Sequence, residues 1–478
     1  MLRLSCTILA SLAIVAPIAL AADPTERTST VAERRLINLT VYNGGTALIR
    51  DRRVVRLEPG LNRLAWRDVS ADMDATSALL EPVGGTDTIA VREQNFDYDL
   101  MSSEALLRKY VGRDVTVVHE PRFAGDRETR ETARVLSVDD GVVLQYRGGI
   151  ETGVRGHILF PVSVNGFRDR PTLVIDLDSS QDASETLDLS YLTRGMSWRA
   201  DYVGVVSADQ TRLSLNGLVT LSNTSGESYE DAHLQLVAGN VNVVEPPEVV
   251  DRALRTIGRV TTNAGPSVEQ ENYFEYHLYS FARQTTILND QTKQLTLLSA
   301  QGIPVRESLE LRGSPGYYRS AEPDIGDRLP VGAYLTFENR GGELGIPLPG
   351  GVVRLYKNDS HNQLQFLGSD LIDHTPRNER VRLHVGDAFD VTARKKQTDF
   401  HFLSPCSTSS SYRIVLANAK STAQNVLVVE PIPAQWQITQ ENIQYVKSSA
   451  STASWDMRVP ADGQSTLTYT ADVTWCFD

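Results

Sequence analysis

Apolar and polar residues alternate along most of this chain. In residues 211–221, the apolar residues Leu213, Leu215, Val219 and Leu221 alternate with the polar residues Arg212, Ser214, Asn216 and Thr220. Because successive side chains of a strand point to opposite faces, this spacing predicts a β-strand with one buried face. Turn signals recur between such segments, as at Pro59-Gly60, which suits a type II turn. The pattern therefore predicts a mainly β protein with many short strands and few helices.

Helical spacing is confined to two short segments. Residues 103–111 carry one apolar stripe and are followed by Gly112, a residue that suits a helix end. Residues 247–258 place apolar and charged side chains on opposite faces, as an amphipathic helix does. This second helix would either cover an edge of its own sheet or dock against a partner or a membrane surface. Its mixed charges favour the first interpretation.

Shifts in these patterns predict a multi-domain chain, which fits a length of 478 residues, because one hydrophobic core rarely serves so long a chain. Residues 33–100 are expected to form an N-terminal β module. Residues 101–180 are expected to form the short helix and a small barrel or sheet. Residues 185–478 are expected to form a larger antiparallel β-sandwich region, interrupted by a proline-rich and helical insertion at 243–272.

The N-terminal residues have the order of a secretory signal peptide. Arg3 precedes an uncharged run over residues 4–22, which ends in the small residues Ala21 and Ala22. This order predicts cleavage near Ala21 or Ala22, with residues 1–21 removed. The expected location is the periplasm; secretion, or anchoring by an uncleaved signal, are the alternatives. No later apolar run approaches the length of a membrane span.

The charge balance bears on the kind of partner. The chain has 47 basic and 60 acidic side chains, a formal net charge of −13, and loss of the leader would remove only one of these charges, Arg3. Because a surface this acidic repels phosphate backbones, nucleic acid is not an expected partner. An envelope protein or a glycan is the expected partner, and the oligomeric state stays open.

Two of the three cysteines, Cys406 and Cys476, lie outside the leader. In an oxidising compartment such a pair predicts a disulfide, with two unrelated thiols as the alternative. The apolar side chains of residues 467–475 occupy alternate positions, which places Cys476 on the opposite, polar face. Any bridge is therefore expected at a sheet edge or at the surface, and not between packed sheets.

A longer motif lies in residues 189–202. A second motif, Leu-Pro-Gly-Gly-Val-Val-Arg-Leu-Tyr, lies further along the chain at 348–356. These segments resemble the C-terminal domain of an uncharacterised family of exported bacterial proteins, a domain of unknown function, over about residues 185–478. The mucoidy inhibitor proteins are similar to the same group, but they carry a coiled coil ahead of this domain, and no heptad pattern occurs here. The family offers no catalytic residues to carry over. We interpret the motif positions as structural: Tyr191, Arg194, Gly195, Trp198, Arg199 and Tyr202.

Signals for metal binding are weak. The sequence contains neither HExxH nor CxxC, the spacings that typically bind zinc. His374 and His384 could converge with Asp373 or Asp387, but isolated strand histidines more often pack or face solvent. We therefore predict no metal site and no cofactor.

Signals for catalysis are also weak. Ser314 is followed by a proline, which offers no backbone N–H to an oxyanion, so this serine is interpreted as part of a turn. The aromatic run at 273–281 is interpreted as core, although exposed aromatics can stack on sugars. The leading hypothesis is a non-catalytic extracytoplasmic β-sandwich protein that binds or scaffolds an envelope component. The alternatives are an envelope hydrolase for glycan or peptide that acts through unidentified acidic residues, and a carbohydrate-binding module.

Overall fold

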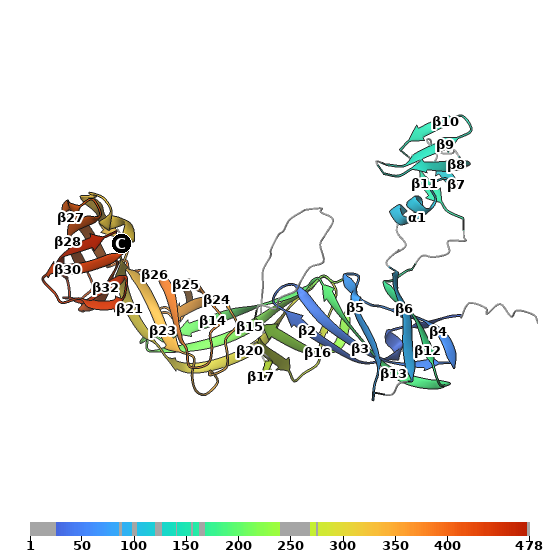
Figure 1. The fold of residues 1–478 in the computed structure, drawn as a ribbon, viewed down its shortest axis with the longest axis horizontal. Helices are drawn as coiled ribbons and strands as arrows, with labels where there is room; N and C mark the ends of the chain where they lie inside the picture. The colour runs from blue at the N-terminus through green and yellow to red at the C-terminus, as the bar shows by residue number, and fades with distance from the viewer. Residues whose placement is uncertain are drawn as a thin grey trace, which may run out of the picture. The chain divides into compact units, whose positions relative to one another are not determined.

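The computed structural model describes residues 25–85, 88–97, 103–119, 127–139, 141–153, 156–161, 168–239, 268–273 and 276–475. Strands dominate these residues (Figure 1), and the mainly β prediction is confirmed. The helix expected at 247–258 lies outside the described residues. Nowhere in the described part of the chain is a helix both long and apolar enough to cross a membrane.

The chain folds as two compact units. Unit 1 comprises Met1–Leu36 and Arg50–Tyr191, and unit 2 comprises Ile37–Ile49 and Leu192–Asp478. The chain passes from one unit to the other within three strands, which are β2 (Arg34–Tyr42), β3 (Thr46–Leu57) and β13 (Ala183–Arg194).

Unit 1 contains a four-stranded sheet with the strand order β1-β4-β12-β6. Its strands are β1 (Glu26–Ser29), β4 (Gly60–Arg67), β12 (Thr172–Ser179) and β6 (Ile89–Asp97). The 3-10 helix η1 (Val31–Glu33) follows β1. In the same unit β13 lies between β3 and β5 (Met73–Pro82). Leu64, Trp66, Leu173 and Ile175 are fully buried in this unit, so apolar residues fill the interior of its strands.

A smaller part of unit 1 begins with α1 (Ser103–Lys109), in agreement with the predicted helix. Gly112 follows α1 with a φ of +79°, a left-handed conformation that favours glycine at a helix end. Five strands then form a sheet with the order β10-β9-β8-β7-β11. They are β7 (Asp114–His119), β8 (Thr129–Ser137), β9 (Val143–Tyr146), β10 (Gly149–Thr152) and β11 (His157–Leu159). Of the barrel and sheet alternatives, the described residues form the open sheet.

Unit 2 begins with strands around β16 (Tyr229–Ala238), which pairs with β2, β18 (Tyr276–Phe281) and β19 (Thr285–Ile287). Strand β17 (Val268–Tyr273) pairs with β18. The next sheet has the order β20-β15-β14-β24-β25. Its strands are β14 (Met196–Val206), β15 (Arg212–Asn223), β20 (Gln291–Pro304), β24 (Gly351–Asn358) and β25 (Leu364–Ile372).

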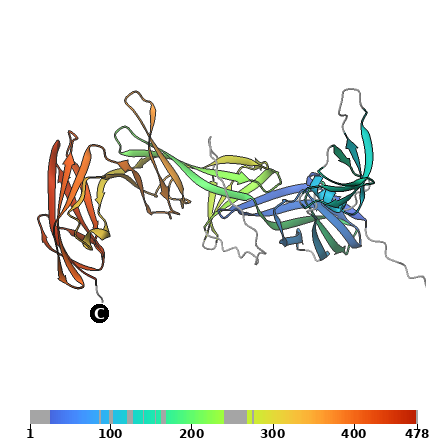
Figure 2. The ribbon, with the colours of Figure 1, turned by 90° about the horizontal axis from the view of Figure 1, so that it is seen from above.

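The C-terminal part of unit 2 is a sandwich of two sheets, whose last strands are the red ones in Figure 2. One sheet has the order β26-β23-β21-β29-β32-β31, and its strands are β21 (Arg306–Arg312), β23 (Gly332–Glu338), β26 (Arg380–Asp387), β29 (Gln424–Pro431), β31 (Val446–Ser449) and β32 (Thr452–Val459). The other has the order β22-β27-β28-β33-β30, and its strands are β22 (Asp324–Leu329), β27 (Val391–Ser404), β28 (Ser407–Asn418), β30 (Gln435–Glu441) and β33 (Gly463–Thr474). The 3-10 helix η2 (Pro315–Tyr318) follows β21.

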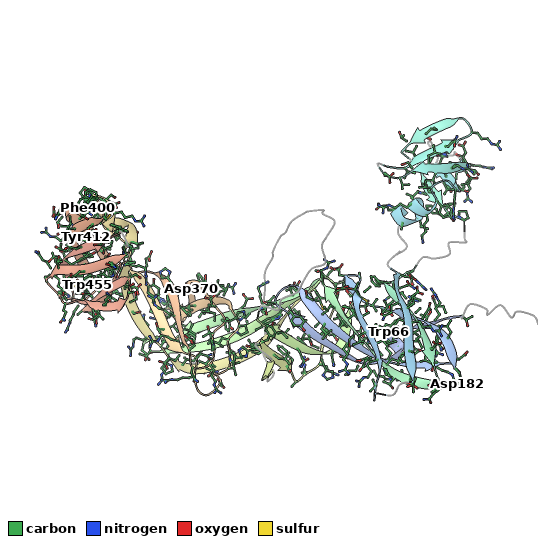
Figure 3. The ribbon with its side chains drawn as sticks, viewed as in Figure 1. Trp66, Asp182, Asp370, Phe400, Tyr412 and Trp455 are labelled. Carbon is green, nitrogen blue, oxygen red and sulfur yellow. The ribbon has the colours of Figure 1, made fainter. Side chains whose placement is uncertain are left out.

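Alternating side chains of both sheets fill the sandwich core. Val426 and Val428 of β29 meet Ile414 and Leu467 of the opposite sheet in one buried cluster, while Trp455 and Tyr412 lie in the same part of the molecule (Figure 3). The sheets are not purely antiparallel, because β21 pairs with β29 in parallel, as β14 does with β24. These parallel pairs join strands far apart in sequence, which local alternation cannot reveal.

Candidate functional site

A groove with a volume of about 1220 Å³ opens in unit 2 where β20 continues into β21. Three arginines line it: Arg306 from the start of β21, Arg340 from the loop after β23, and Arg380 from the start of β26. We call this site the arginine groove. Glu338 and Glu343 are also part of its lining.

The loop that carries Arg340 is held by a buried asparagine. The side-chain amide of Asn339 donates hydrogen bonds to the carbonyl oxygens of Ile346 (2.7 Å) and Pro376 (3.0 Å), and its side-chain oxygen accepts one from the Gly345 N–H (3.1 Å). Asn339 is fully buried. The chain between Asn339 and Gly345 is therefore fixed at both ends by one side chain.

Charge in the arginine groove is only partly paired. Arg340 Nε lies 3.0 Å from Glu338 Oε2, in an exposed ion pair. Within the described residues, neither Arg306 nor Arg380 forms an ion pair, although Arg380 lies opposite Glu338 in the register of β26 and β23. Guanidinium groups donate paired hydrogen bonds that match carboxylate and phosphate oxygens. The groove is thus suited to hold an anion.

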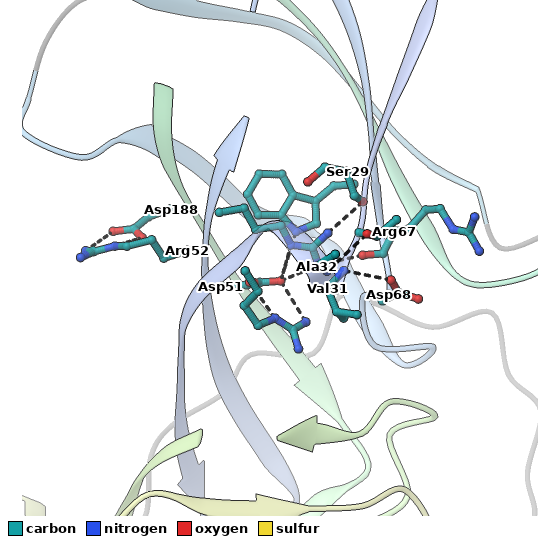
Figure 4. A network of polar contacts seen from close by, with 12 residues as sticks. Ser29, Val31, Ala32, Asp51, Arg52, Arg67, Asp68 and Asp188 are labelled. Carbon is teal, nitrogen blue, oxygen red and sulfur yellow. Dashed lines mark hydrogen bonds and ion pairs between the residues drawn. The ribbon is translucent and has the colours of Figure 1, made fainter. Parts of the chain in front are cut away.

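A buried polar network surrounds Asp51 in unit 1 (Figure 4). Arg53 Nη2 donates to Asp51 Oδ2 (2.7 Å), Arg34 Nε donates to Asp51 Oδ1 (3.0 Å), and Trp66 Nε1 donates to Oδ2 (3.2 Å). Arg53 is fully buried, stacks over the Trp66 ring at 4.6 Å, and also donates to the carbonyl oxygen of Ser29 (2.9 Å). Substrate cannot reach this network, which holds the strands of unit 1 together.

Two opposing effects set the pKa of Asp51. Burial by itself raises the pKa of the Asp51 carboxyl, but the guanidinium groups of Arg53 and Arg34 outweigh it and leave the pKa below its ordinary value. The carboxylate is therefore ionised at neutral pH. The interior of unit 1 keeps a charge because that charge is fully partnered.

A second buried cluster lies within the C-terminal sandwich. Lys395 Nζ is 2.6 Å from Glu430 Oε2, and both side chains are at most 1% exposed. Tyr318 and Tyr469 hydrogen-bond to this pair. Like the Asp51 network, this cluster is closed to solvent and cannot receive a ligand from outside.

The aromatic residues of the family motif lie in the interior. The hydroxyl of Tyr202 donates to the carbonyl oxygen of Pro349 (2.8 Å) within unit 2. In unit 1 the hydroxyl of Tyr191 accepts from the Ser70 N–H (3.2 Å). Trp198 packs edge-on against Tyr279 at 6.4 Å. All these rings are buried.

The remaining motif positions form a turn and an ion pair. Gly195 has a φ of +79° between β13 and β14, a conformation that a side chain would strain. Arg199 Nε lies 3.2 Å from Asp201, a buried carboxylate that also binds Arg354 at 2.9 Å. Arg194 is exposed beside the turn. None of these positions lines the arginine groove.

The other residues singled out from the sequence are dispersed. His384 Nε2 lies 3.6 Å from Asp387, whereas His374 Nδ1 accepts from the Gly350 N–H (3.1 Å). Throughout the described residues, no three His, Cys, Asp or Glu side chains gather as metal ligands. The Ser314 hydroxyl caps η2. Cys406 lies in the turn between β27 and β28, while Ala21, Ala22 and Cys476 lie outside the described residues.

Sequence reasoning missed the arginine groove. Arg306, Arg340 and Arg380 come from three separate places in the chain, and no motif links them. One local signal was available, the Asn339-Arg340-Gly341-Gly342 string, where Gly341 and Gly342 have φ values of +73° and +54°. Such a string predicts a tight turn, but not what it faces.

The family comparison concerns the part of the chain that contains the groove. No curated protein matches this chain. A family model described as a domain of unknown function, DUF4139, matches residues 187–476, which is more than half of the chain. The expectation of an uncharacterised family is confirmed at this level. The chain belongs to the DUF4139 family.

Proposed function

We propose that this protein is a non-catalytic binding or scaffolding protein of the cell envelope, and that the arginine groove holds an anionic group of its partner. The partner would be an envelope protein or a glycan that carries carboxylates or phosphates. The observation that carries this proposal is that two arginines of the groove, Arg306 and Arg380, form no ion pair with any residue that the structure describes.

Electrostatics support this assignment. The whole chain has a formal net charge of −13, which repels anions over most of the surface. The lining of the groove carries three arginines and two glutamates, a formal charge of +1, whereas the chain as a whole is acidic. A charge-assisted hydrogen bond to an arginine contributes about 1.5–3 kcal/mol. Two such contacts are enough to select an anionic partner.

The lining of the groove favours binding over hydrolysis. Among the described residues that line it there is no cysteine, histidine or serine, and Thr336 carries its one side-chain hydroxyl. Glu338 and Glu343 are the two carboxylates that a glycan hydrolase would need, but Glu338 is already paired with Arg340. A hydrolase remains the second candidate, because two carboxylates in one groove are the minimum for that chemistry.

We expect the double variant Arg306→Gln/Arg380→Gln to bind anionic probes at least about tenfold more weakly, as the loss of one charge-assisted contact requires. The probes are inorganic phosphate, a uronic acid oligosaccharide and an acidic peptide, each titrated by calorimetry. The matched control is Arg413→Gln, which removes an exposed arginine of β28 outside the groove. Binding by the wild type should weaken with added salt.

Equal binding by the double variant and the wild type would refute the groove as the anion site. Turnover of an oligosaccharide or peptide that is lost in Glu343→Gln would instead favour the hydrolase. Binding of a neutral oligosaccharide, unaffected by Arg306→Gln/Arg380→Gln, would favour a carbohydrate-binding module.

We also propose that the protein is exported to the periplasm and is related to the mucoidy inhibitor proteins. The support for export is the order of cation, apolar run and small residues before Ala22. The support for the relationship is the motif at 189–202. Cell fractionation together with the N-terminal sequence of the native protein tests export, and an N-terminus at residue 1 in a cytoplasmic fraction would contradict it.

Cys406 and Cys476 are proposed to form a disulfide. The Trp475 N–H donates to the carbonyl oxygen of Cys406 (2.8 Å), and the β28–β33 register pairs Ser407 with Thr474. Trp475, the residue before Cys476 in the sequence, therefore lies beside Cys406. A bridge that closes a loop of roughly 70 residues contributes on the order of 4 kcal/mol in the chain-entropy model.

We expect both cysteines of the native protein to resist alkylation after denaturation without reductant, and to react once reductant is added. Mass spectrometry of the alkylated protein measures this. The Cys406→Ser variant is the control, because Cys476 should then react without reductant. Alkylation of both cysteines in unreduced native protein would overturn the bridge.

A further inference from the structure

Lys395 and Glu430 are buried together between the two sheets of the C-terminal sandwich. Lys395 comes from β27 of one sheet, and Glu430 comes from β29 of the other. Lys395 Nζ lies 2.6 Å from Glu430 Oε2, and the two residues are 35 positions apart in sequence. An amine and a carboxyl group thus face each other across a hydrophobic core.

Aromatic rings enclose the lysine. Its Nζ lies 4.6 Å from the ring centroids of both Tyr317 and Tyr412. The Tyr412 ring stacks on Tyr469 at 5.1 Å. Burial lowers the pKa of Lys395, and the neighbouring Glu430 only partly offsets that effect. This environment favours a neutral amine far more than water does.

Two tyrosine hydroxyls close a ring of hydrogen bonds around the pair. Lys395 Nζ donates to the Tyr469 hydroxyl (3.3 Å), which lies 2.9 Å from the Tyr318 hydroxyl. The Tyr318 hydroxyl donates to Glu430 Oε2 (3.1 Å). This ring provides a path by which a proton of the ammonium group reaches the carboxylate through the two hydroxyls.

The ionised pair is not fully satisfied. Glu430 Oε1 is buried and has no hydrogen-bond partner among the described residues. The Gly313 backbone packs against this carboxylate so closely that an added Cβ would come within 2.2 Å of Oε2. An anionic oxygen without a donor in a core is costly, whereas a neutral amide oxygen in the same place costs less.

From this geometry we propose that Lys395 and Glu430 condense to an intramolecular isopeptide bond. The neutral Nζ of Lys395 attacks Cδ of the protonated Glu430 carboxyl group, and a C–N bond forms. The C–Oε2 bond breaks, and Oε2, which already carries the carboxyl proton, leaves as water with a second proton from the Tyr318 hydroxyl. Tyr469 takes up a proton from nitrogen and passes its own hydroxyl proton to Tyr318, so that both hydroxyls are restored. Oε1 becomes the amide oxygen. No oxidant or reductant is involved, and both buried charges disappear.

Proximity lowers the barrier to this reaction. Groups held at contact distance in a rigid core can reach effective concentrations of about 10⁵–10⁸ M, and the water released leaves an apolar interior. The product would link the two sheets covalently. Such a link would hold the sandwich closed under proteolysis. The inference does not depend on the arginine groove.

Intact mass spectrometry of the full-length native protein, denatured and reduced, tests this inference. We expect a mass lower by one water than the mature sequence requires. Digestion should yield one branched peptide that contains both Lys395 and Glu430. The Lys395→Met variant should have the unmodified mass. The matched control is Lys396→Met, which removes a neighbouring exposed lysine and should retain the loss of water.

A native protein with the full mass of its mature sequence would overturn the proposal, whether or not any variant folds. A branched peptide that joins other residues would overturn the assignment to this pair. The variant Tyr318→Phe/Tyr469→Phe keeps both reacting groups and removes the proton path. We expect its loss of water to be slower than that of the wild type, and an equal rate would remove the tyrosines from the mechanism.

Discussion

Replacement of Asp51 by alanine is expected to destabilise unit 1 by about 3–5 kcal/mol, the cost of breaking a buried ion pair by removing one partner. The variant leaves Arg53, which is fully buried, without its carboxylate. It also removes the acceptor of Arg34 and of the Trp66 indole N–H. Native-state hydrogen exchange of β3 and β4 amides measures this loss locally.

The matched control is Asp182→Ala, which removes the partner of Arg56 at the surface of the same unit. Because both side chains of that pair are more than half exposed, the expected loss is only about 0–1 kcal/mol. Asp182 is labelled in Figure 3, as is Trp66 of the buried network. Similar losses for the two variants would contradict a stabilising role for the Asp51 network.

The same carboxylate predicts how the stability of unit 1 depends on pH. The pKa of Asp51 is lower in the folded protein than its ordinary value, so the unfolded chain binds the proton more tightly. The stabilisation is therefore present above the unfolded pKa of about 3.9, and it is lost as pH falls through the folded pKa. In the Asp51→Asn variant, the stability of unit 1 should therefore depend less on pH in the acidic range. Urea titrations at a series of pH values, followed by hydrogen exchange, measure this dependence.

Replacement of Trp455 by alanine is expected to cost the C-terminal sandwich about 3–5 kcal/mol, as large-to-small changes of buried aromatic residues do. Trp455 is fully buried and stacks on Tyr469 at 4.8 Å. Its indole N–H donates to the carbonyl oxygen of Ile443 (3.0 Å). The variant therefore opens a cavity between the sheets and removes the donor of that backbone group.

The measurement is the midpoint of urea unfolding, followed by hydrogen exchange of β28 and β33 amides. The control is Phe389→Ala, which removes a ring that is 82% exposed and should change stability by less than about 0.5 kcal/mol. If Trp455→Ala and Phe389→Ala had equal effects, the Trp455 side chain would not be a central part of this core.

The alternation of apolar and polar positions in the sequence already indicated that the charged residues of both buried clusters point inward. In β3 the positions of Ile49, Asp51, Arg53 and Val55 alternate with more accessible ones, and all four are buried. In β27 the same alternation places Lys395 on the buried side with Val391 and Ala393. A strand has a period of two, so a charged residue between inward apolar positions must also point inward.

The partners of these inward charges could not be predicted in the same way. Glu430 lies in β29, and β29 belongs to the opposite sheet of the sandwich from β27. A single sequence records the face of each strand, but it does not record which strands pack against each other. The arginine groove could not be predicted for the same reason. Arg306, Arg340 and Arg380 meet only through the pairing of β21, β23 and β26.

The sequence by itself determined the β class, the short helix at the start of residues 103–111 and membership in an uncharacterised family, because periodicity and motif are local properties of the chain. Tertiary structure decided the parallel pairs, the sealed Asp51 and Lys395–Glu430 clusters, and the groove. These features depend on contacts between residues that are distant in sequence. Packing of whole strands sets such contacts, and no local pattern encodes them.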